Sequence, residues 1–489
     1  MSYKIMLPAQ GTTITAEYGD NLLEALRSNG FGPDAPCGGL GKCGKCKVLV
    51  EGKQALSCQY TIQSDIAVEL SKTDLPSVLL AGDMPTVKLS PLKRGPMIAF
   101  DIGTTTVACF LMDENGIEIA SESMLNPQIC YGADVISRIR NALDGQLDTL
   151  TKAIRDGMTE LIQNVCKKVG ICPADAAIVS VVGNPCMQQL FLGISPENLA
   201  EIPFAPVIVR ASVQAAAEYL PICCNALLLT VPDVAGFIGA DTMACVLASG
   251  MYEAADTILL VDIGTNGEMV LSHEGRMVAC SAAAGPALEG ANISSGMRGS
   301  AGAIDHVWSE KGKLTFSTIK DIEPRGICGS GLIDTVAFMI ENGIVNARGR
   351  IQTEKTTGGT CAFHICGNIW LTQEDITQVQ LTKGAIAAGI QLMAEHLGIV
   401  IDRIDRVLLA GAFGTFMRPE SACKIGMLPA ELDGKVSAVG NIAGSGAKLI
   451  ACNAERFWKT EDLMRRIEFL ELSKIPNFSR VFAQCMRFP

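Results

Sequence analysis

Four cysteines near the N-terminus have the residue type and the spacing of a metal site. Cys37, Cys43, Cys46 and Cys58 follow the pattern C-x5-C-x2-C-x11-C. Thiolates are soft ligands that suit zinc or iron–sulfur clusters, but four-cysteine zinc sites usually contain two short C-x2-C knuckles and this segment has only one. Three ligands on one loop with a distant fourth is instead an arrangement that binds a [2Fe–2S] cluster. The spacing therefore favours an all-cysteine [2Fe–2S] cluster; zinc and plain buried thiols are the alternatives.

The residues around these cysteines predict the elements that position them. The loop contains four glycines that let the backbone wrap a cluster and aim N–H groups at its sulfur atoms, namely Gly38, Gly39, Gly41 and Gly44. Strands are expected over residues 4–10, 13–18, 46–50 and 66–70, with a turn at Glu51-Gly52. Asp20 is expected to cap a helix that ends at Gly30. This order of elements resembles a β-grasp ferredoxin domain of the plant type.

A second candidate site comes from a motif that occurs twice. Asp-Ile-Gly-Thr ends an apolar strand at residues 101–104 and again at 262–265, and each copy continues into a strand, an acidic-glycine turn and a third strand. One such motif is a weak signal, but two in the same frame indicate an internal duplication. A glycine-rich β-turn exposes N–H groups to phosphate oxygens, and aspartates such as Asp101 and Asp262 can hold Mg²⁺ through water. Two such hairpins facing each other would clamp a triphosphate from both sides of a cleft.

These hairpins define the predicted nucleotide site. The binding residues are Gly103, Thr104 and Thr105 from the first copy and Gly264, Thr265 and Asn266 from the second. Asp101 and Asp262 are predicted to be catalytic; Glu268 is a third candidate for positioning water or magnesium, and an exposed strand-end carboxylate is an equal alternative for it. The glycine-rich entries into apolar helices at 236–250 and 326–340 fit either close helix packing or a hinge and nucleotide contact. Asn184-Pro185 predicts a turn after an apolar strand, with no chemistry assigned to it.

The duplicated hairpins resemble the core of the actin, sugar-kinase and heat-shock-chaperone superfamily at its first and second phosphate motifs. That superfamily places its adenosine loop after a later strand, and here RVLLAGAFGTF (406–416) reads as a strand running into a G-x-x-G turn. The resemblance thus assigns Gly411, Ala412 and Gly414 to nucleotide binding. It implies an α/β fold in which a β-grasp ferredoxin domain (α+β) is followed by a duplicated actin-like ATPase fold, with two α/β lobes around a nucleotide cleft.

Composition limits the remaining choices. The 489 residues are 48% hydrophobic, which argues against disorder, and the net charge of −11 argues against a nucleic-acid surface. No apolar stretch is long enough to span a membrane, and the N-terminus lacks the apolar region of a signal peptide, so we expect a cytoplasmic protein whose 19 cysteines are mostly reduced. The expected domains are residues 1–80, a Pro-rich linker over 81–96, and an ATPase domain over 97–489 with lobes of about 97–255 and 256–489.

The whole chain resembles the ATP-dependent reductive activators of corrinoid proteins. The likeness rests on the four cysteines, both DIGT hairpins, and the segments VGNPCMQQLFLGI, AAAGPALEGANISSGMRGSAGAI, PRGICGSGLID and GAFG. Longer members have an additional middle segment that this sequence lacks, so any dimer contacts made by that segment do not carry over, and a homodimer is left open.

The resemblance implies an ATP-hydrolysing corrinoid reductase of anaerobic metabolism. Such an enzyme converts the Co(II) of a corrinoid methyl-carrier protein in a methyltransferase system to Co(I), using ATP, Mg²⁺, a [2Fe–2S] cluster and an upstream low-potential electron donor. Neither a membrane nor a nucleic acid is an expected partner. The alternatives are an activator of another low-potential metalloenzyme, a ferredoxin-fused small-molecule kinase, or an ATP-sensing electron-transfer scaffold without catalytic activity.

Overall fold

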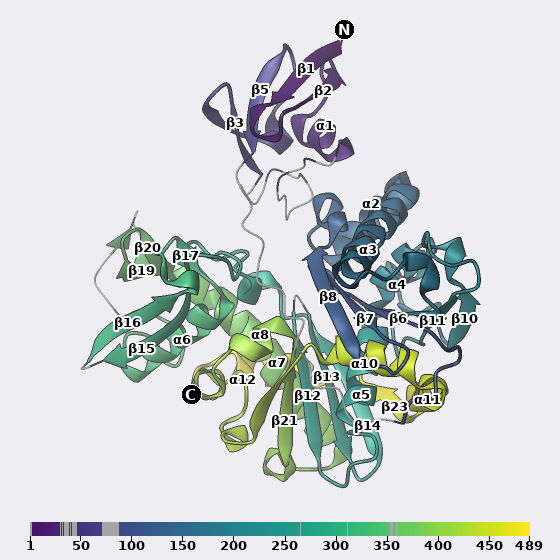
Figure 1. The fold of residues 1–489 in the computed structure, drawn as a ribbon. Coiled ribbons are helices and arrows are strands. Elements are labelled where there is room, and N and C mark those ends of the chain that lie inside the picture. Colours follow the sequence, from purple (N-terminus) through teal and green to yellow (C-terminus); the bar gives the residue numbers. More distant parts are fainter. Residues whose placement is uncertain are drawn as a thin grey trace.

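The computed structural model describes residues 2–29, 31, 33, 39, 41, 46–70, 88–264, 266–310, 312–352, 356–357 and 360–489. Figure 1 shows a small N-terminal β domain and two larger lobes. Cys37 and Cys43 of the cysteine motif, two of its glycines (Gly38 and Gly44), and Thr265 of the second hairpin lie outside the described residues.

The N-terminal domain is a five-stranded sheet with the order β2-β1-β5-β3-β4. Its strands are β1 (Ser2–Leu7), β2 (Thr12–Glu17), β3 (Lys47–Val50), β4 (Lys53–Leu56) and β5 (Ile66–Leu70). β1 pairs antiparallel with β2 and parallel with β5. Helix α1 (Leu22–Ser28) buries Leu22 and Leu26 in one apolar cluster with Ile5 and Val48 of the sheet. The predicted β-grasp ferredoxin fold is confirmed.

The cap of α1 differs from the prediction by one residue. The side-chain oxygen of Asn21, not of Asp20, accepts hydrogen bonds from the N–H groups of the first helical turn, at 3.0 and 3.4 Å. The Asp20 carboxylate instead accepts the N–H of Glu17 at 2.7 Å. Asp20 therefore closes the turn between β2 and α1, which leaves the next residue to cap the helix. Gly30, the predicted helix end, lies outside the described residues.

The rest of the chain forms two lobes, each built on a six-stranded sheet. The first lobe has the order β10-β11-β9-β6-β7-β8 and the second has the order β22-β21-β12-β13-β14-β23. The first sheet contains β6 (Met97–Ile102), β7 (Thr106–Met112), β8 (Glu118–Leu125), β9 (Ile178–Gly183), β10 (Ser212–Ala215) and β11 (Leu227–Thr230). The second contains β12 (Ile258–Ile263), β13 (Gly267–His273), β14 (Arg276–Ala282), β21 (Arg406–Ala410), β22 (Val436–Gly440) and β23 (Ile467–Phe469).

The two large sheets share one topology. In each, an antiparallel three-strand meander (β6-β7-β8 and β12-β13-β14) has two parallel strands added beside its first strand (β9 then β11, and β21 then β22). The first strand of each meander is a nearly continuous buried apolar run, as expected for a strand with parallel neighbours and helices on both faces. The predicted duplication and the actin-like fold are confirmed.

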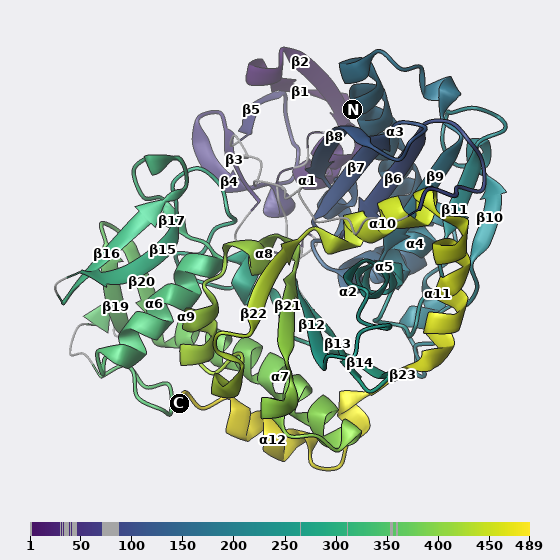
Figure 2. The same cartoon turned by 60° about the horizontal axis from the view of Figure 1, so that its bottom comes forward.

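Helices α5 (Ala240–Ser249) and α10 (Ile442–Cys452) join the lobes. They pack on each other, and α10 also contacts β6 and β9 although it comes from the C-terminal part of the chain, as Figure 2 shows. A single apolar cluster includes Ala99 of β6, Met243 of α5, Leu449 of α10 and Leu260 of β12. A Cβ on Gly446 would lie 2.2 Å from the Ala244 carbonyl oxygen, so only glycine permits this close helix contact. This cluster therefore joins the two lobes, and each lobe also has an apolar cluster of its own.

The described end of the predicted linker is attached to the ATPase lobes. Ser90 donates its N–H to the Cys452 carbonyl at 2.9 Å and accepts the N–H of Ala454 at 2.7 Å. Asn453 donates a side-chain hydrogen bond to the Lys88 carbonyl at 2.8 Å. Residues 88–96 are thus held in place rather than acting as a free spacer.

The remaining elements surround the two large sheets. Two small sheets contain β15 (Ala303–Glu310), β16 (Lys313–Thr318) and β17 (Gly326–Ile327), and β18 (Thr356–Thr357), β19 (Thr360–Cys366) and β20 (Ile369–Thr372). The other helices are α2 (Val135–Asn141), α3 (Leu147–Val169), α4 (Pro185–Leu192), α6 (Gly329–Glu341), α7 (Gln373–Leu397), α8 (Gly411–Phe416), α9 (Pro419–Lys424), α11 (Ala454–Arg466) and α12 (Phe478–Cys485). None of the helices in the described ranges combines the length and the apolar character needed to cross a membrane.

Candidate nucleotide and iron–sulfur sites

Two aspartates occupy equivalent positions in the duplicated sheets. Asp101 is the penultimate residue of β6 and Asp262 is the penultimate residue of β12, and both are partly exposed at the end of a buried strand. Burial raises the pKa of Asp101 to about 7; a side-chain hydrogen bond from Asn441 lowers it and the charge of Asp262 raises it. Burial likewise raises the pKa of Asp262 to about 6. The fold therefore brings the two predicted aspartates together.

A third aspartate, which the sequence analysis did not single out, joins this pair. Asp241 is the second residue of α5, in the helix entry that could only be assigned to packing or to nucleotide contact. Burial raises the pKa of Asp241 to about 7, and the charges of Asp262 and Asp101 contribute to the increase. The sequence could have indicated Asp241, because it is the one acidic residue in the apolar segment 236–250.

Glu268 lies directly opposite Asp262 in the β12–β13 hairpin, as its register partner. Burial raises the pKa of Glu268 well above its ordinary value, and the charges of Asp241 and Asp262 raise it further, while a side-chain hydrogen bond from Asn266 lowers it. The hairpin therefore gives Glu268 a place beside the aspartates rather than at an isolated strand end.

Within the described part of the chain, these four carboxyl groups have no positively charged partner. No ion pair within the described parts of the chain joins Asp101, Asp241, Asp262 or Glu268 to a lysine or arginine. No three His, Cys, Asp or Glu side chains among the described residues are placed to hold a bare metal ion. Mg²⁺ is usually bound through a few carboxylates, waters and substrate phosphates rather than in an all-protein cage. The group thus fits a hydrated Mg²⁺–nucleotide complex.

The first hairpin has the tight turn that a phosphate loop requires. Gly103 donates its N–H to the Thr106 carbonyl at 2.9 Å, and a Cβ at this position would lie 2.9 Å from the same oxygen. Asn184 donates a side-chain hydrogen bond to the Thr104 hydroxyl at 3.0 Å, and the fully buried Arg138 donates to the Thr104 carbonyl. Hydrogen bonds from the side chains of Asn184 and Arg138 therefore hold the hairpin in place.

The second hairpin has a different backbone contact, to a carbonyl two residues ahead rather than three, and one hydrogen bond connects the two lobes beside it. Gly264 donates its N–H to the Asn266 carbonyl at 2.9 Å. The hydroxyl of Thr105, in the first hairpin, donates to the Glu289 carboxylate at 3.4 Å. Glu289 ends a short turn (Pro286–Glu289) of the second lobe, so this hydrogen bond spans the lobes at the predicted phosphate position.

The predicted adenosine loop, which begins at Gly411, lies next to Asp262, but it does not form the predicted turn. Residues 411–416 form the short helix α8 rather than a G-x-x-G turn, because the chain continues helically from the end of β21. Gly411 has a φ of +79°, and a Cβ there would lie 2.8 Å from the Asp262 carboxylate. Gly414 packs closely on Leu409, with a Cβ position 3.0 Å from the Leu409 Cβ. The side chain of Ala412 lies outside the described residues.

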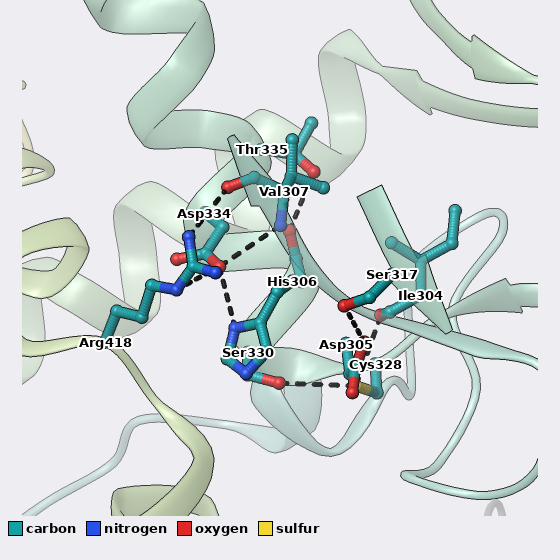
Figure 3. A network of polar contacts seen from close by, with 11 residues as sticks. Ile304, Asp305, His306, Val307, Ser317, Cys328, Ser330, Asp334, Thr335 and Arg418 are labelled. Carbon is teal, nitrogen blue, oxygen red and sulfur yellow. Dashed lines mark hydrogen bonds and ion pairs between the residues drawn. The ribbon is translucent and has the colours of Figure 1, made fainter. Parts of the chain in front are cut away.

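A buried polar network fastens the segment after α8 to the outer part of the second lobe (Figure 3). Asp334 of α6 is almost fully buried and accepts hydrogen bonds from His306 Nδ1 at 3.0 Å and from the Val307 N–H at 3.2 Å. Arg418, two residues beyond α8, lies 3.7 Å from the same carboxylate and donates to the Val307 carbonyl at 3.3 Å. The α8 region is therefore rigidly supported.

The two described cysteines of the N-terminal motif lie side by side. Cys46 and Cys58 flank the β3–β4 hairpin, and their Sγ atoms are 3.2 Å apart. Gly39 and Gly41 have φ values of +90° and +72°, and a Cβ on Gly41 would lie 2.6 Å from the side chain of Gln59. Two soft ligands at this separation beside a glycine-dependent loop fit an iron–sulfur cluster.

These features define a class of protein: a two-lobed, actin-like ATPase fused to a ferredoxin-like domain. Protein-family models match the same parts of the chain: a 2Fe–2S iron–sulfur cluster binding domain over residues 6–69, the RACo middle region over 97–254, and the C-terminal domain of RACo, the ASKHA domain, over 256–489. The protein therefore has an iron–sulfur cluster-binding domain and an ATPase domain.

Three similar proteins show to which family this chain belongs. The corrinoid activation enzyme RamQ of Eubacterium limosum is 30% identical over 582 aligned positions, covering 98% of both chains. A Methanosarcina barkeri [Co(II) methylated amine-specific corrinoid protein] reductase is 26% identical over 76% of this chain and 72% of its own. The solved structure of a reductive activator for corrinoid,iron–sulfur protein superposes with a TM-score of 0.71 at 27% identity, covering 100% of this chain and 98% of that one. The chain belongs to the family of reductive activators of corrinoid proteins.

Proposed function

We propose that this protein hydrolyses ATP to drive the reduction of a corrinoid methyl-carrier protein of a methyltransferase system from Co(II) to Co(I). The observation that carries the proposal is the union, in one chain of this family, of a paired-cysteine site with a carboxylate-lined nucleotide site. A kinase would have no use for the cysteine site, and nothing in the described structure favours an activator of another enzyme or a scaffold.

The cysteines would hold the electron carrier. Cys46 and Cys58 supply two ligands and Cys37 and Cys43 complete the set, so that a bound [2Fe–2S] cluster supplies a one-electron centre near roughly −400 mV. An upstream low-potential donor must supply that electron. We infer domain limits of 1–80 for this part, 81–96 for the connecting segment and 97–489 for the ATPase, with the lobes divided near residue 255.

The energy of ATP is needed because Co(I) forms at still lower potential. For one electron, each 100 mV of unfavourable potential corresponds to about 2.3 kcal/mol. A protein conformation that favours one state of the partner by a few kcal/mol offsets one or two such steps. We propose that the ATP-bound lobes stabilise a complex in which the cobalt loses an axial ligand and becomes easier to reduce.

The four carboxyl groups would have different roles in ATP hydrolysis. Asp101 and Asp262, at the two strand ends, would hold Mg²⁺, and the two hairpins would offer N–H groups to the phosphates. Burial raises the pKa of Asp241 to about 7, which suits a group that takes a proton from the attacking water near neutral pH. Glu268, opposite Asp262 in the hairpin, would position that water or the magnesium. A phosphate between the hairpins would replace the hydrogen bond that Thr105 now gives to Glu289.

Binding linkage supplies the test. If ATP acts by stabilising the complex with the Co(II) partner, that partner must change the affinity for nucleotide by the same factor. Calorimetric titration of a non-hydrolysable MgATP analogue, with and without the Co(II) corrinoid protein, should show a shift in affinity that the methylated partner produces less. Identical affinities and unchanged ATP turnover would contradict the proposal, and phosphorylation of an added small molecule would favour a kinase.

A further inference from the structure

A chain of buried polar contacts runs behind the nucleotide site, through a segment to which the sequence analysis assigned no chemistry. Asn184 is not in a simple turn: its side-chain oxygen caps helix α4 by accepting the N–H of Met187 at 3.0 Å. Its side-chain N–H group reaches the Thr104 hydroxyl of the first phosphate hairpin at 3.0 Å. The start of α4 is thereby attached to the predicted phosphate position.

The next turn of α4 extends this chain to the start of α5. Gln188 is fully buried, and its side-chain N–H group donates to the Asp233 carboxyl group at 3.0 Å and to the Val231 carbonyl at 3.3 Å. Asp233 is also fully buried and accepts a hydrogen bond from the N–H of Ala240, the first residue of α5. Asp241 directly follows Ala240, so these hydrogen bonds connect α4 to the carboxyl group at the start of α5.

The backbone closes the same connection. A Cβ on Gly239 would lie 2.6 Å from the Asn184 Cα and 2.7 Å from the Gly183 carbonyl oxygen. The residue before α5 is therefore in direct contact with the residue that caps α4. A displacement of either helix start would have to be shared by the other, since packed interiors do not deform continuously.

We propose that Asn184, Gln188 and Asp233 are positioning residues that fix the Asp241 carboxylate relative to the phosphate hairpin at Thr104. The inference rests on the proposed hydrolysis of ATP at this cleft. Asp233 performs this role as a hydrogen-bond acceptor, and its second oxygen is buried with no hydrogen-bond partner among the described residues. Burial and the charge of Asp241 raise the pKa of Asp233 well above its ordinary value. Displacement of a catalytic group by about 1 Å can lower a rate about 100-fold.

Helix α4 offers a matched pair of variants. Gln188 and Gln189 are adjacent and both fully buried, but among the residues that the structure describes neither polar atom of the Gln189 side chain has a hydrogen-bond partner. Gln188→Met removes the donor to Asp233, whereas Gln189→Met removes no hydrogen bond. We expect Gln188→Met to lower kcat for MgATP hydrolysis at least about tenfold with KM within about threefold, and Gln189→Met to stay within about twofold of the natural protein.

Two further variants separate positioning from charge and from folding. Asp233→Asn keeps an acceptor of the same shape and is expected to retain kcat within about threefold. Asn184→Ser keeps a good helix cap but cannot reach Thr104, so it should also lower kcat, and combining it with Gln188→Met should add little because both act in one chain. If Gln188→Met does not fold, Asn184→Ser carries the test.

Equal kcat values for the two glutamine variants, or loss of activity in Asp233→Asn, would overturn the inference. Melting temperatures and MgADP affinities of each variant show whether a slow rate reflects unfolding or lost binding. If the unmodified protein does not hydrolyse ATP, the proposed function itself fails; if it does and the glutamine variants match it, only the positioning role fails.

Discussion

Replacement of Asp241 by asparagine should lower activity and raise stability together. The substitution removes one of several mutually repelling carboxylates while keeping its shape. Loss of a general base typically lowers a rate about 10²- to 10⁴-fold, which at about 1.4 kcal/mol per decade is roughly 3 to 5 kcal/mol of transition-state stabilisation. We therefore expect kcat for MgATP to fall at least about 100-fold.

The stability change follows from the raised pKa. Burial and neighbouring charges raise the pKa of Asp241 from 3.8 to about 7, so the folded protein holds a proton that the unfolded chain releases between these values. Stability thus falls as pH rises through this window and levels off above it. At about 1.4 kcal/mol per pKa unit, three units give roughly 4 kcal/mol as an upper bound, because water reaching the partly exposed carboxylate screens it.

Thermal unfolding without nucleotide, at pH 8 and at pH 4, measures this effect beside steady-state ATP hydrolysis. Asp241→Asn should melt at a higher temperature than the natural protein at pH 8. The difference should shrink at pH 4, where Asp241 of the folded protein is protonated and the carboxyl of the unfolded chain is close to its own pKa of 3.8. Unchanged kcat would remove Asp241 from the reaction. A lower melting temperature at pH 8 would show that Asp241 supports the fold instead.

Three other expectations follow from the same structure. Cys58→Ser should remove or shift the iron–sulfur signal in electron paramagnetic resonance while leaving MgATP turnover unchanged, because the cysteine site and the ATPase lobes belong to separate folds; lost turnover would link them. Asp262→Ala should abolish turnover with a nearly normal melting temperature, since it ends a strand whose core residues remain, and a large stability loss with retained hydrolysis would reverse the assignment. MgATP analogue should raise the melting temperature more at pH 8 than at pH 5, because ionised Asp101, Asp241 and Asp262 (pKa about 7, 7 and 6) then need the cation; an opposite trend would argue against Mg²⁺ at these carboxylates.

The sequence predicted those parts of the fold whose signals are local. The DIGT hairpins are read from a repeated strand, turn and strand, and the structure confirms both meanders around Asp101 and Asp262. The order of the other β-grasp elements was predicted too, but strand β4 (Lys53–Leu56) was missed. The helix cap is Asn21 rather than Asp20, because the Asp20 carboxylate accepts the N–H of Glu17 instead.

The missed features depend on contacts between distant segments. Asp241 is a single acidic residue in an apolar helix, and nothing in its neighbourhood shows that α5 begins beside two strand ends far away in the chain. Asn184 looked like an ordinary turn residue because its partner Thr104 is 80 residues away. The G-x-x-G segment at Gly411 lies next to Asp262 but forms a helix, since a strand end followed by glycine is compatible with either a turn or a helix start.

The most direct test of the proposed function is the appearance of Co(I). The protein, with its cluster loaded and reduced, is mixed anaerobically with a Co(II) corrinoid protein, and the Co(I) absorption band is followed with MgATP, with MgADP and without nucleotide. We predict that the band appears with MgATP but not with MgADP or without nucleotide, and that Asp262→Ala fails to produce it. Equal Co(I) formation without nucleotide, or none with MgATP, would contradict the claim that ATP drives this reduction.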